Sequence, residues 1–156
     1  MPEQKPQPVR EDLADRLEIT DLLSRYTIAI DDKDWDALDT VFTADAVIDY
    51  TSSGGVRGAY PEVKAWLQKA LAPFTMTQHL LGNSRIEIEG DEGRSRTYFF
   101  NPMGVPKDGG GLHLFYVGGY YHDRLARTAD GWRIVERIEE QAWMDGTLPE
   151  GFQIPE

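Results

Sequence analysis

Two residues, Asp31 and His79, have the types and surroundings needed for acid–base chemistry. Asp31 comes at the end of a helical pattern, where the helix dipole disfavours another carboxylate, so a structural reason for it is weak. His79 begins the extended stretch TQHLLGN, and histidine is the side chain best suited to act as a general base near neutral pH. A carboxylate behind the ring would orient it and raise its basicity. Taken singly, the two also fit a solvated turn aspartate and a hydrogen-bonded strand histidine.

Three further side chains could assist such a base. The hydroxyls of Tyr26 and Tyr50 could polarise a ligand carbonyl, although buried tyrosines often serve as amphipathic core. Arg137 lies within WRIVERIEE. It could be a surface cation paired with Glu136 or Glu139, or a donor to an oxyanion or a leaving group.

Strand alternation adds two candidate ligand contacts. Asn83 shares the face of His79, two positions beyond Leu81. Alternation also places Arg137 opposite Ile134, either facing solvent or facing the ligand together with Trp143. We therefore include Asn83 and Trp143 among the expected binding residues.

Other site types have little support in the sequence. There is no cysteine, which excludes thiolate chemistry and sulfur-based zinc sites. His113 and His122 could form a metal site with His79 only if the fold happened to bring them together, and no paired-ligand spacing supports one. Neither a G-x-S-x-G elbow nor a phosphate-binding Walker loop occurs. We expect no metal and no organic cofactor.

Composition narrows the partners. The 156 residues carry a net charge of −11, with 27 acidic against 16 basic residues. A negative surface repels the phosphates of nucleic acids and of anionic membranes, so neither is an expected partner. The seven Tyr, four Trp and six Phe favour a small hydrophobic or aromatic ligand. MPEQKPQPVRED does not resemble a secretory signal, and no apolar run approaches the ~20 residues of a membrane span. We expect a cytoplasmic protein.

The elements that must position these residues follow from the periodicity. A helix is predicted from an Asp12 cap to about Ile30, then a short helix capped by Asp32 or Asp34, a strand at 46–50 and a helix opening at Pro61. Four strands follow, at about 76–89, 94–103, 112–127 and 132–144, separated by turn signals. We expect a disordered leader over 1–10, a single domain over 11–146 and a C-terminal tail over 147–156.

Helices first and a long sheet last define the α+β class, without Rossmann alternation. A strongly curved mixed sheet wrapped around the N-terminal helix makes a cone whose interior is a pocket. Glycines 82, 104, 118 and 119 fit bulges or close approach in such a sheet, and a bulge near Gly82 would reconcile the face of His79 with that of Ile86 and Ile88.

Taken together, DDKDWDAL, VIDY, TQHLLGN and DGWRI resemble the scytalone dehydratase and hexachlorocyclohexane dehydrochlorinase branch of the nuclear transport factor 2-like superfamily, which also holds the SnoaL-like proteins. The resemblance spans about residues 12–145 and implies a cystatin-like α+β barrel. It also implies His79 as base, Asp31 as its partner, Tyr50 as carbonyl activator and Arg137 as assistant to a departing chloride.

The departures from this pattern concern the residues that contact the substrate. Ile30 stands where the dehydratase has a second tyrosine, and Tyr26 stands where the dehydrochlorinase has a lysine. A second dehydratase histidine has no counterpart in residues 94–104. The resemblance thus implies the base and its partner without either named substrate.

Three functions remain open at this point. The first is a cofactor-independent lyase or isomerase, dehydratase-like or dehydrohalogenase-like, that takes a proton from a cyclic or aromatic molecule. The second is a non-catalytic small-molecule-binding or accessory-subunit domain. The third is an epoxide hydrolase, which needs an Asp–Arg–Asp set whose third member we cannot place. The resemblance also implies a homo-oligomer, a trimer or a dimer.

Overall fold

The computed structural model describes residues 11–153, so the expected leader lies outside the described residues. The elements are α1 (Leu13–Asp31), α2 (Trp35–Leu38), β1 (Phe42–Asp49), β2 (Arg57–Ala59), α3 (Tyr60–Ala70), β3 (Met76–Thr77), β4 (Leu80–Glu89), β5 (Glu92–Pro106), β6 (Leu112–Thr128) and β7 (Gly131–Gly146), with a single 3₁₀ turn at Thr51–Ser53. None of the helices in this part of the chain is long and apolar enough to cross a membrane.

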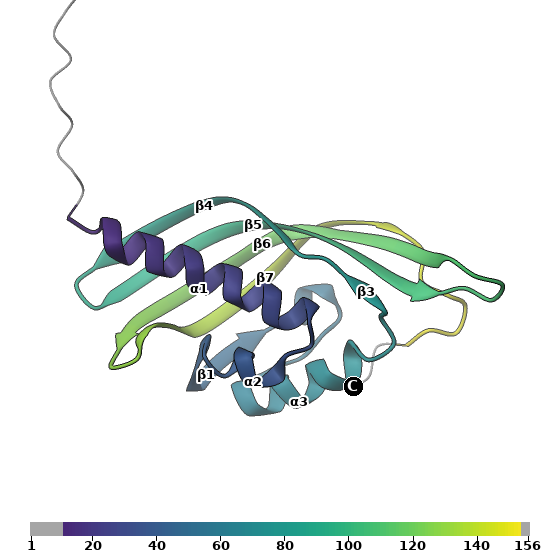
Figure 1. Ribbon diagram of the computed structural model, residues 1–156, viewed down its shortest axis with the longest axis horizontal. Helices are drawn as coiled ribbons and strands as arrows, with labels where there is room; N and C mark the ends of the chain where they lie inside the picture. Colours follow the sequence, from purple (N-terminus) through teal and green to yellow (C-terminus); the bar gives the residue numbers. More distant parts are fainter. Residues whose placement is uncertain (1–10, 154–156) are drawn as a thin grey trace, which may run out of the picture.

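The strands form one mixed sheet in the order β2-β1-β7-β6-β5-β3, with β4 also paired to β5. The β1–β7 pair is parallel and the other pairs are antiparallel. Figure 1 shows α1 lying along one face of the curved sheet built by β4 to β7, with β1, α2 and α3 below the C-terminal half of α1 in this view. The predicted α+β architecture, a curved sheet around the N-terminal helix, is confirmed.

Helix α1 packs because its apolar residues repeat at helical spacing. The buried set is Ile19, Leu22, Leu23, Tyr26, Thr27, Ala29 and Ile30. Asp12 holds the predicted N-cap position, but its side chain makes no cap hydrogen bond and instead accepts from Arg16 Nε at 2.8 Å. Lys33, at φ 54°, reverses the chain just after Asp31, and Asp34 caps α2 by accepting from Ala37 N at 2.9 Å.

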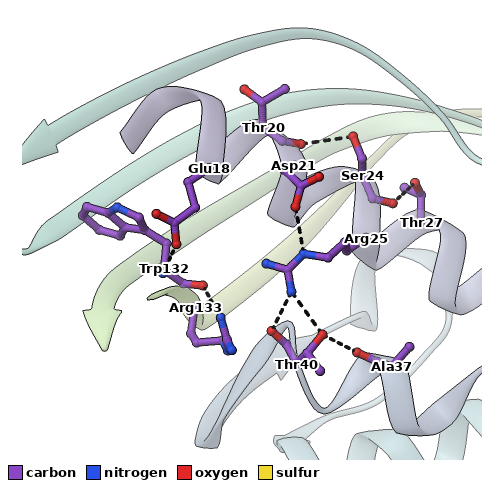
Figure 2. A network of polar contacts seen from close by, with 10 residues as sticks. All are labelled: Glu18, Thr20, Asp21, Ser24, Arg25, Thr27, Ala37, Thr40, Trp132 and Arg133. Carbon is purple, nitrogen blue, oxygen red and sulfur yellow. Dashed lines mark hydrogen bonds and ion pairs between the residues drawn. The ribbon is translucent and has the colours of Figure 1, made fainter. Parts of the chain in front are cut away.

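Polar contacts fix α1 along the sheet (Figure 2). Glu18 accepts the backbone N–H of Trp132, at the start of β7, at 2.8 Å. Arg25, nearly two turns further on, donates to Asp21 and to both the carbonyl and the hydroxyl of Thr40, which leads into β1. These bonds join α1 to the start of β7 and to the segment that precedes β1.

The sheet bends at bulges, as the glycines predicted. Pairing between β4 and β5 shifts between Leu81 and Ser84, which confirms the bulge near Gly82. Pairing between β6 and β7 shifts at Gly118/Gly119. A Cβ on Gly119 would lie 2.1 Å from the carbonyl oxygen of Glu140, so no larger residue fits there.

Candidate functional site

Asp31, the last residue of α1, meets the segment that joins β3 to β4. Its carboxylate accepts three hydrogen bonds: from the Thr77 hydroxyl at 2.8 Å, from the His79 backbone N–H at 2.7 Å and from the His79 ring Nδ1 at 2.6 Å. The carboxylate–imidazole distance lies within the range that a base and its orienting partner require. The side chains are 6% exposed for His79 and 19% for Asp31.

The surroundings keep Asp31 ionised. Burial by itself would raise the pKa of this carboxyl, but the hydrogen bonds and charge of His79, with the Thr77 bond, outweigh it, so the pKa lies below its ordinary value. An ionised carboxylate can only accept hydrogen bonds, so Nδ1 carries the proton. The Nε2 atom of the neutral ring is then left with its lone pair, the form that a general base needs.

His79 lines a cavity of about 140 Å³ inside the cone. The polar side chains on its wall are Tyr26, Tyr50, Ser53, His79, Asn101, Tyr121, Glu139 and Gln141. Apolar residues complete it, including Ile30, Trp66, Leu71, Phe74, Phe99 and Phe115. Such a lining suits a small ring with one or two polar substituents.

The C-terminal segment helps to close this cavity. Leu148 belongs to its wall, and the Phe152 ring packs on Phe74 with centroids 5.3 Å apart. Residues 147–153, expected as a tail, therefore pack against the domain. A larger hollow of about 550 Å³ lies on the outer face of the sheet, among Arg85, Arg94 and Glu136. Its charged walls do not include His79, so we place the candidate site in the smaller cavity.

Tyr26 and Tyr50 both line the cavity. Their hydroxyl oxygens lie 2.7 Å apart, and either can be the donor. Burial raises the pKa of both phenols, that of Tyr50 well above its ordinary value. Both therefore stay neutral near pH 7. Because one proton suffices for their mutual bond, the other hydroxyl proton is available to a ligand oxygen.

Arg137 lies deeper than the cavity wall. Its guanidinium donates to both carboxylate oxygens of Asp123 at 2.7 Å, and both side chains are 0% exposed. The Cζ atom lies 4.0 Å from the ring centroid of Tyr26 and 4.2 Å from that of Tyr121. Arg137 is not among the residues that line the cavity, so it meets neither expectation, a surface cation or a ligand donor.

Two bulges explain where alternation misplaced side chains. Glu136 and Ile134 pair with consecutive residues of β6, so Val135 is extra, and Arg137 falls on the same buried face as Ile134 instead of the opposite one. Ala142 is extra in the same way, which turns Trp143 to the outer face, where it is 47% exposed.

Asn83 also lies outside the cavity. It falls within the bulge between Leu81 and Ser84 and is exposed. The bulge that was expected near Gly82 thus removes Asn83 from the face of His79. The predictions of Asn83 and Trp143 as cavity contacts are corrected on this ground.

Sequence reasoning missed several cavity residues. Glu139 lines the wall and accepts a short hydrogen bond from the Ser53 hydroxyl. Asn101 Oδ1 and the Tyr121 hydroxyl are buried there without a hydrogen-bond partner among the described residues. A signal existed for Asn101, a lone polar residue beside the aromatic run TYFF. Glu139 gave none, because it stands in a run of charges, ERIEE.

Burial raises the pKa of the Glu139 carboxyl, against the opposing effects of the Ser53 hydrogen bond and the charges of His79 and Arg137. The cavity thus holds one carboxyl with a raised pKa, while the Asp31 carboxyl behind His79 has a lowered one. Residues 11–153 hold no group of three or more His, Cys, Asp or Glu side chains able to bind a metal ion.

Comparison with known proteins supports the same fold. A protein described as a candidate aromatic ring hydroxylase from Novosphingobium aromaticivorans is 28% identical, with a TM-score of 0.78 over 91% of this chain and 96% of the other. A hexachlorocyclohexane dehydrochlorinase structure is 20% identical, with a TM-score of 0.75 over 92% and 95%. A candidate scytalone dehydratase from Novosphingobium aromaticivorans is 17% identical, with a TM-score of 0.77 over 91% and 97%.

Sequence relatives extend the match. An uncharacterized protein of Mycobacterium tuberculosis is 43% identical over 132 residues, which cover 85% of this chain and 88% of that protein. The model of the SnoaL-like domain matches residues 11–138. The expected nuclear transport factor 2-like fold is confirmed, with dehydratase-like and dehydrochlorinase structures as neighbours, and the chain belongs to the SnoaL-like domain family.

Proposed function

We propose that the protein is a cofactor-independent lyase or isomerase that removes a proton from a cyclic or aromatic small molecule. The observation that carries the proposal is the 2.6 Å bond between His79 Nδ1 and Asp31, which leaves Nε2 of a cavity-lining ring as an acceptor. His79 takes a proton made acidic by a neighbouring carbonyl, and Asp31 stabilises the imidazolium that forms. The acidity comes from the substrate, so no step of this scheme requires a cofactor.

The tyrosine pair supplies the second part of the scheme. As a proton leaves the carbon, negative charge develops on the carbonyl oxygen, and a neutral phenol hydroxyl can donate to it. Tyr50 and Tyr26 line the cavity wall with their hydroxyls in contact, which supports this role. A general base contributes about 10²–10⁴-fold and a good oxyanion donor about 10²–10³-fold. Together these suit an activated C–H bond.

The ligand class follows from the lining. Aromatic and aliphatic side chains form most of the wall, and a cavity of about 140 Å³ suits one small ring. The 28% identical protein described as a candidate aromatic ring hydroxylase supports the same kind of ligand without assigning the reaction. The competing proposal, a domain that binds such a ring without turnover, is separated by the following experiment.

The experiment is deuterium exchange on a panel of cyclic ketones in D₂O, followed by NMR. We expect exchange at the carbon beside the carbonyl, lowered by at least about 10²-fold in His79→Gln, with little change in KM. His122→Gln is the matched control, since His122 also pairs with a carboxylate, Glu140, at 2.6 Å but lies outside the cavity. Exchange that persists undiminished in His79→Gln rules out the base, and its absence over the whole panel leaves the binding function ahead.

A further inference from the structure

The cavity contains a carboxyl group to which this scheme gives no task. This group belongs to Glu139, on β7; no other Asp or Glu among the described residues lines the cavity. The 3₁₀ turn at Thr51–Ser53 holds it from both sides: Ser53 Oγ donates to the carboxyl, and Ser52 Oγ donates to the Glu139 backbone carbonyl at 2.7 Å. The backbone N–H of Gln141 in turn donates to Ser52 Oγ at 2.9 Å. The carboxyl is therefore fixed in position toward the ligand space.

Among residues 11–153, Glu139 forms no ion pair with a cationic side chain. Arg137, two positions earlier on β7, donates Nε and Nη2 to Asp123 at 2.7 Å, and its buried Nη1 has no hydrogen-bond partner among the described residues. The His79 ring is bound through Nδ1 to Asp31 at 2.6 Å. With one neutral hydroxyl donor and an apolar wall, burial prevails and raises the pKa of Glu139. The carboxyl therefore keeps its proton to a higher pH than an exposed glutamate would, in the same cavity that the His79 ring lines.

We propose that Glu139 is the proton donor of the cavity, which protonates an oxygen that leaves the substrate. This inference rests on the proposed function, because His79 must first take the proton from carbon. The C–H electrons then form the new double bond, the C–O bond breaks, and the departing hydroxyl takes the Glu139 proton and leaves as water. The products are the unsaturated ketone, water, imidazolium and carboxylate, and return of the proton from His79 to Glu139 through water resets the site.

A proton donor distinguishes between leaving groups. A hydroxyl leaves readily only as water and needs the proton, whereas chloride leaves as an anion and needs none. The cation that could assist chloride, Arg137, is held by Asp123 behind the rings of Tyr26 and Tyr121. The site geometry therefore assigns the specificity to β-hydroxy ketones over their chlorinated counterparts.

The first test needs no substrate. Infrared difference spectra between wild type and Glu139→Gln at pH 7 should contain the carbonyl stretch of a protonated carboxyl group. Glu140→Gln is the control, because Glu140 is exposed and lies outside the cavity. The absolute spectrum of this variant should still contain the band. Ser53→Ala should move the titration of the band to higher pH, since the Ser53 hydrogen bond lowers the pKa of Glu139. A wild-type spectrum without the band at pH 7 overturns the proposal.

The second test measures elimination from β-hydroxycyclohexanone and β-chlorocyclohexanone. We expect Glu139→Gln to slow the loss of water by at least about 10²-fold and to change the loss of chloride by less than about threefold. In wild type the rate of water loss should fall at high pH, because Glu139 loses its proton, and this fall should be absent in Glu139→Gln. Equal slowing of both reactions, or none in the loss of water, contradicts a proton donor. Failure of carbon exchange in wild type counts against the proposed function, and the infrared result still decides whether Glu139 is neutral.

Discussion

Two carboxylate pairs in this fold show how similar groups acquire different tasks. Asp123 and Arg137 are joined by two hydrogen bonds of 2.7 Å and have no exposed side-chain surface. Asp31 and His79 are joined by one bond of 2.6 Å, and the ring of His79 forms part of the cavity wall. In the first pair the carboxylate and the guanidinium neutralise each other in the protein interior. In the second pair Nε2 of His79 remains available to a ligand. Access to the cavity, more than burial or charge, separates the two.

The largest expected effect comes from breaking the sealed pair. Arg137→Met leaves Asp123 charged and unpaired in the interior, so we expect a loss of about 3–5 kcal/mol in the free energy of unfolding, measured by urea denaturation. Arg124→Met is the matched control, because the Arg124–Glu136 pair joins the residues next to Asp123 and Arg137 on the same two strands. This pair is exposed and should contribute at most about 1 kcal/mol to the free energy of unfolding. If Arg137→Met is as mild as Arg124→Met, the sealed pair has no structural role.

A double substitution refines this result. Arg137→Met combined with Asp123→Leu removes both charges and should recover much of the lost stability, because no uncompensated charge remains. A double variant as unstable as the single one would show that the stability lost in Arg137→Met comes from packing and not from charge. The packing in question is that of Arg137 Cζ on the ring centroids of Tyr26 and Tyr121, at 4.0 and 4.2 Å.

The accessible pair should have a smaller, pH-dependent effect on stability. We expect Asp31→Asn to cost about 1–2 kcal/mol at pH 7, since hydrogen bonds to a charged group are lost. The pKa of Asp31 is lowered in the folded state, so its contribution is complete above the unfolded pKa of about 3.9. It is lost as the pH falls through the lower folded pKa.

Urea denaturation of wild type and Asp31→Asn from pH 7 to pH 3 measures this difference. The two stabilities should converge toward the acid end of the range. Asp32→Asn is the control, because Asp32 is exposed and its replacement should change stability by no more than about 0.5 kcal/mol. A constant difference between wild type and Asp31→Asn at every pH would contradict ionic stabilisation.

The same comparison shows what the sequence could predict. Hydrophobic periodicity gave α1 and the long strands, because each buries one face and the spacing records it. The Asp31–His79 pair was expected from the family resemblance, and the two side chains lie 2.6 Å apart in the structure. These features depend on patterns that lie within a single element or a motif.

The errors arose where one element depends on another. Periodicity of two places side chains only until a bulge, after which every later residue changes face. The extra residues Val135 and Ala142 occur where β7 meets β6, and they decide the positions of Arg137 and Trp143. Glu139 reached the cavity by the same route. No signal local to β7 records where its partner strand forces an extra residue.

The smallest expected effect joins the two pairs. The ring centroid of Tyr26 lies 4.0 Å from Arg137 Cζ. The hydroxyl of Tyr26 forms a 2.7 Å hydrogen bond with the hydroxyl of Tyr50 in the cavity. Tyr26→Phe and Tyr50→Phe keep the rings and remove one hydroxyl each, so each should cost about 1 kcal/mol of stability. The double variant should cost less than the sum, with a coupling of about 1 kcal/mol, because one shared bond is lost in all three proteins. Denaturation of the four proteins measures the cycle, and additive costs would show that the two hydroxyls do not bond in solution.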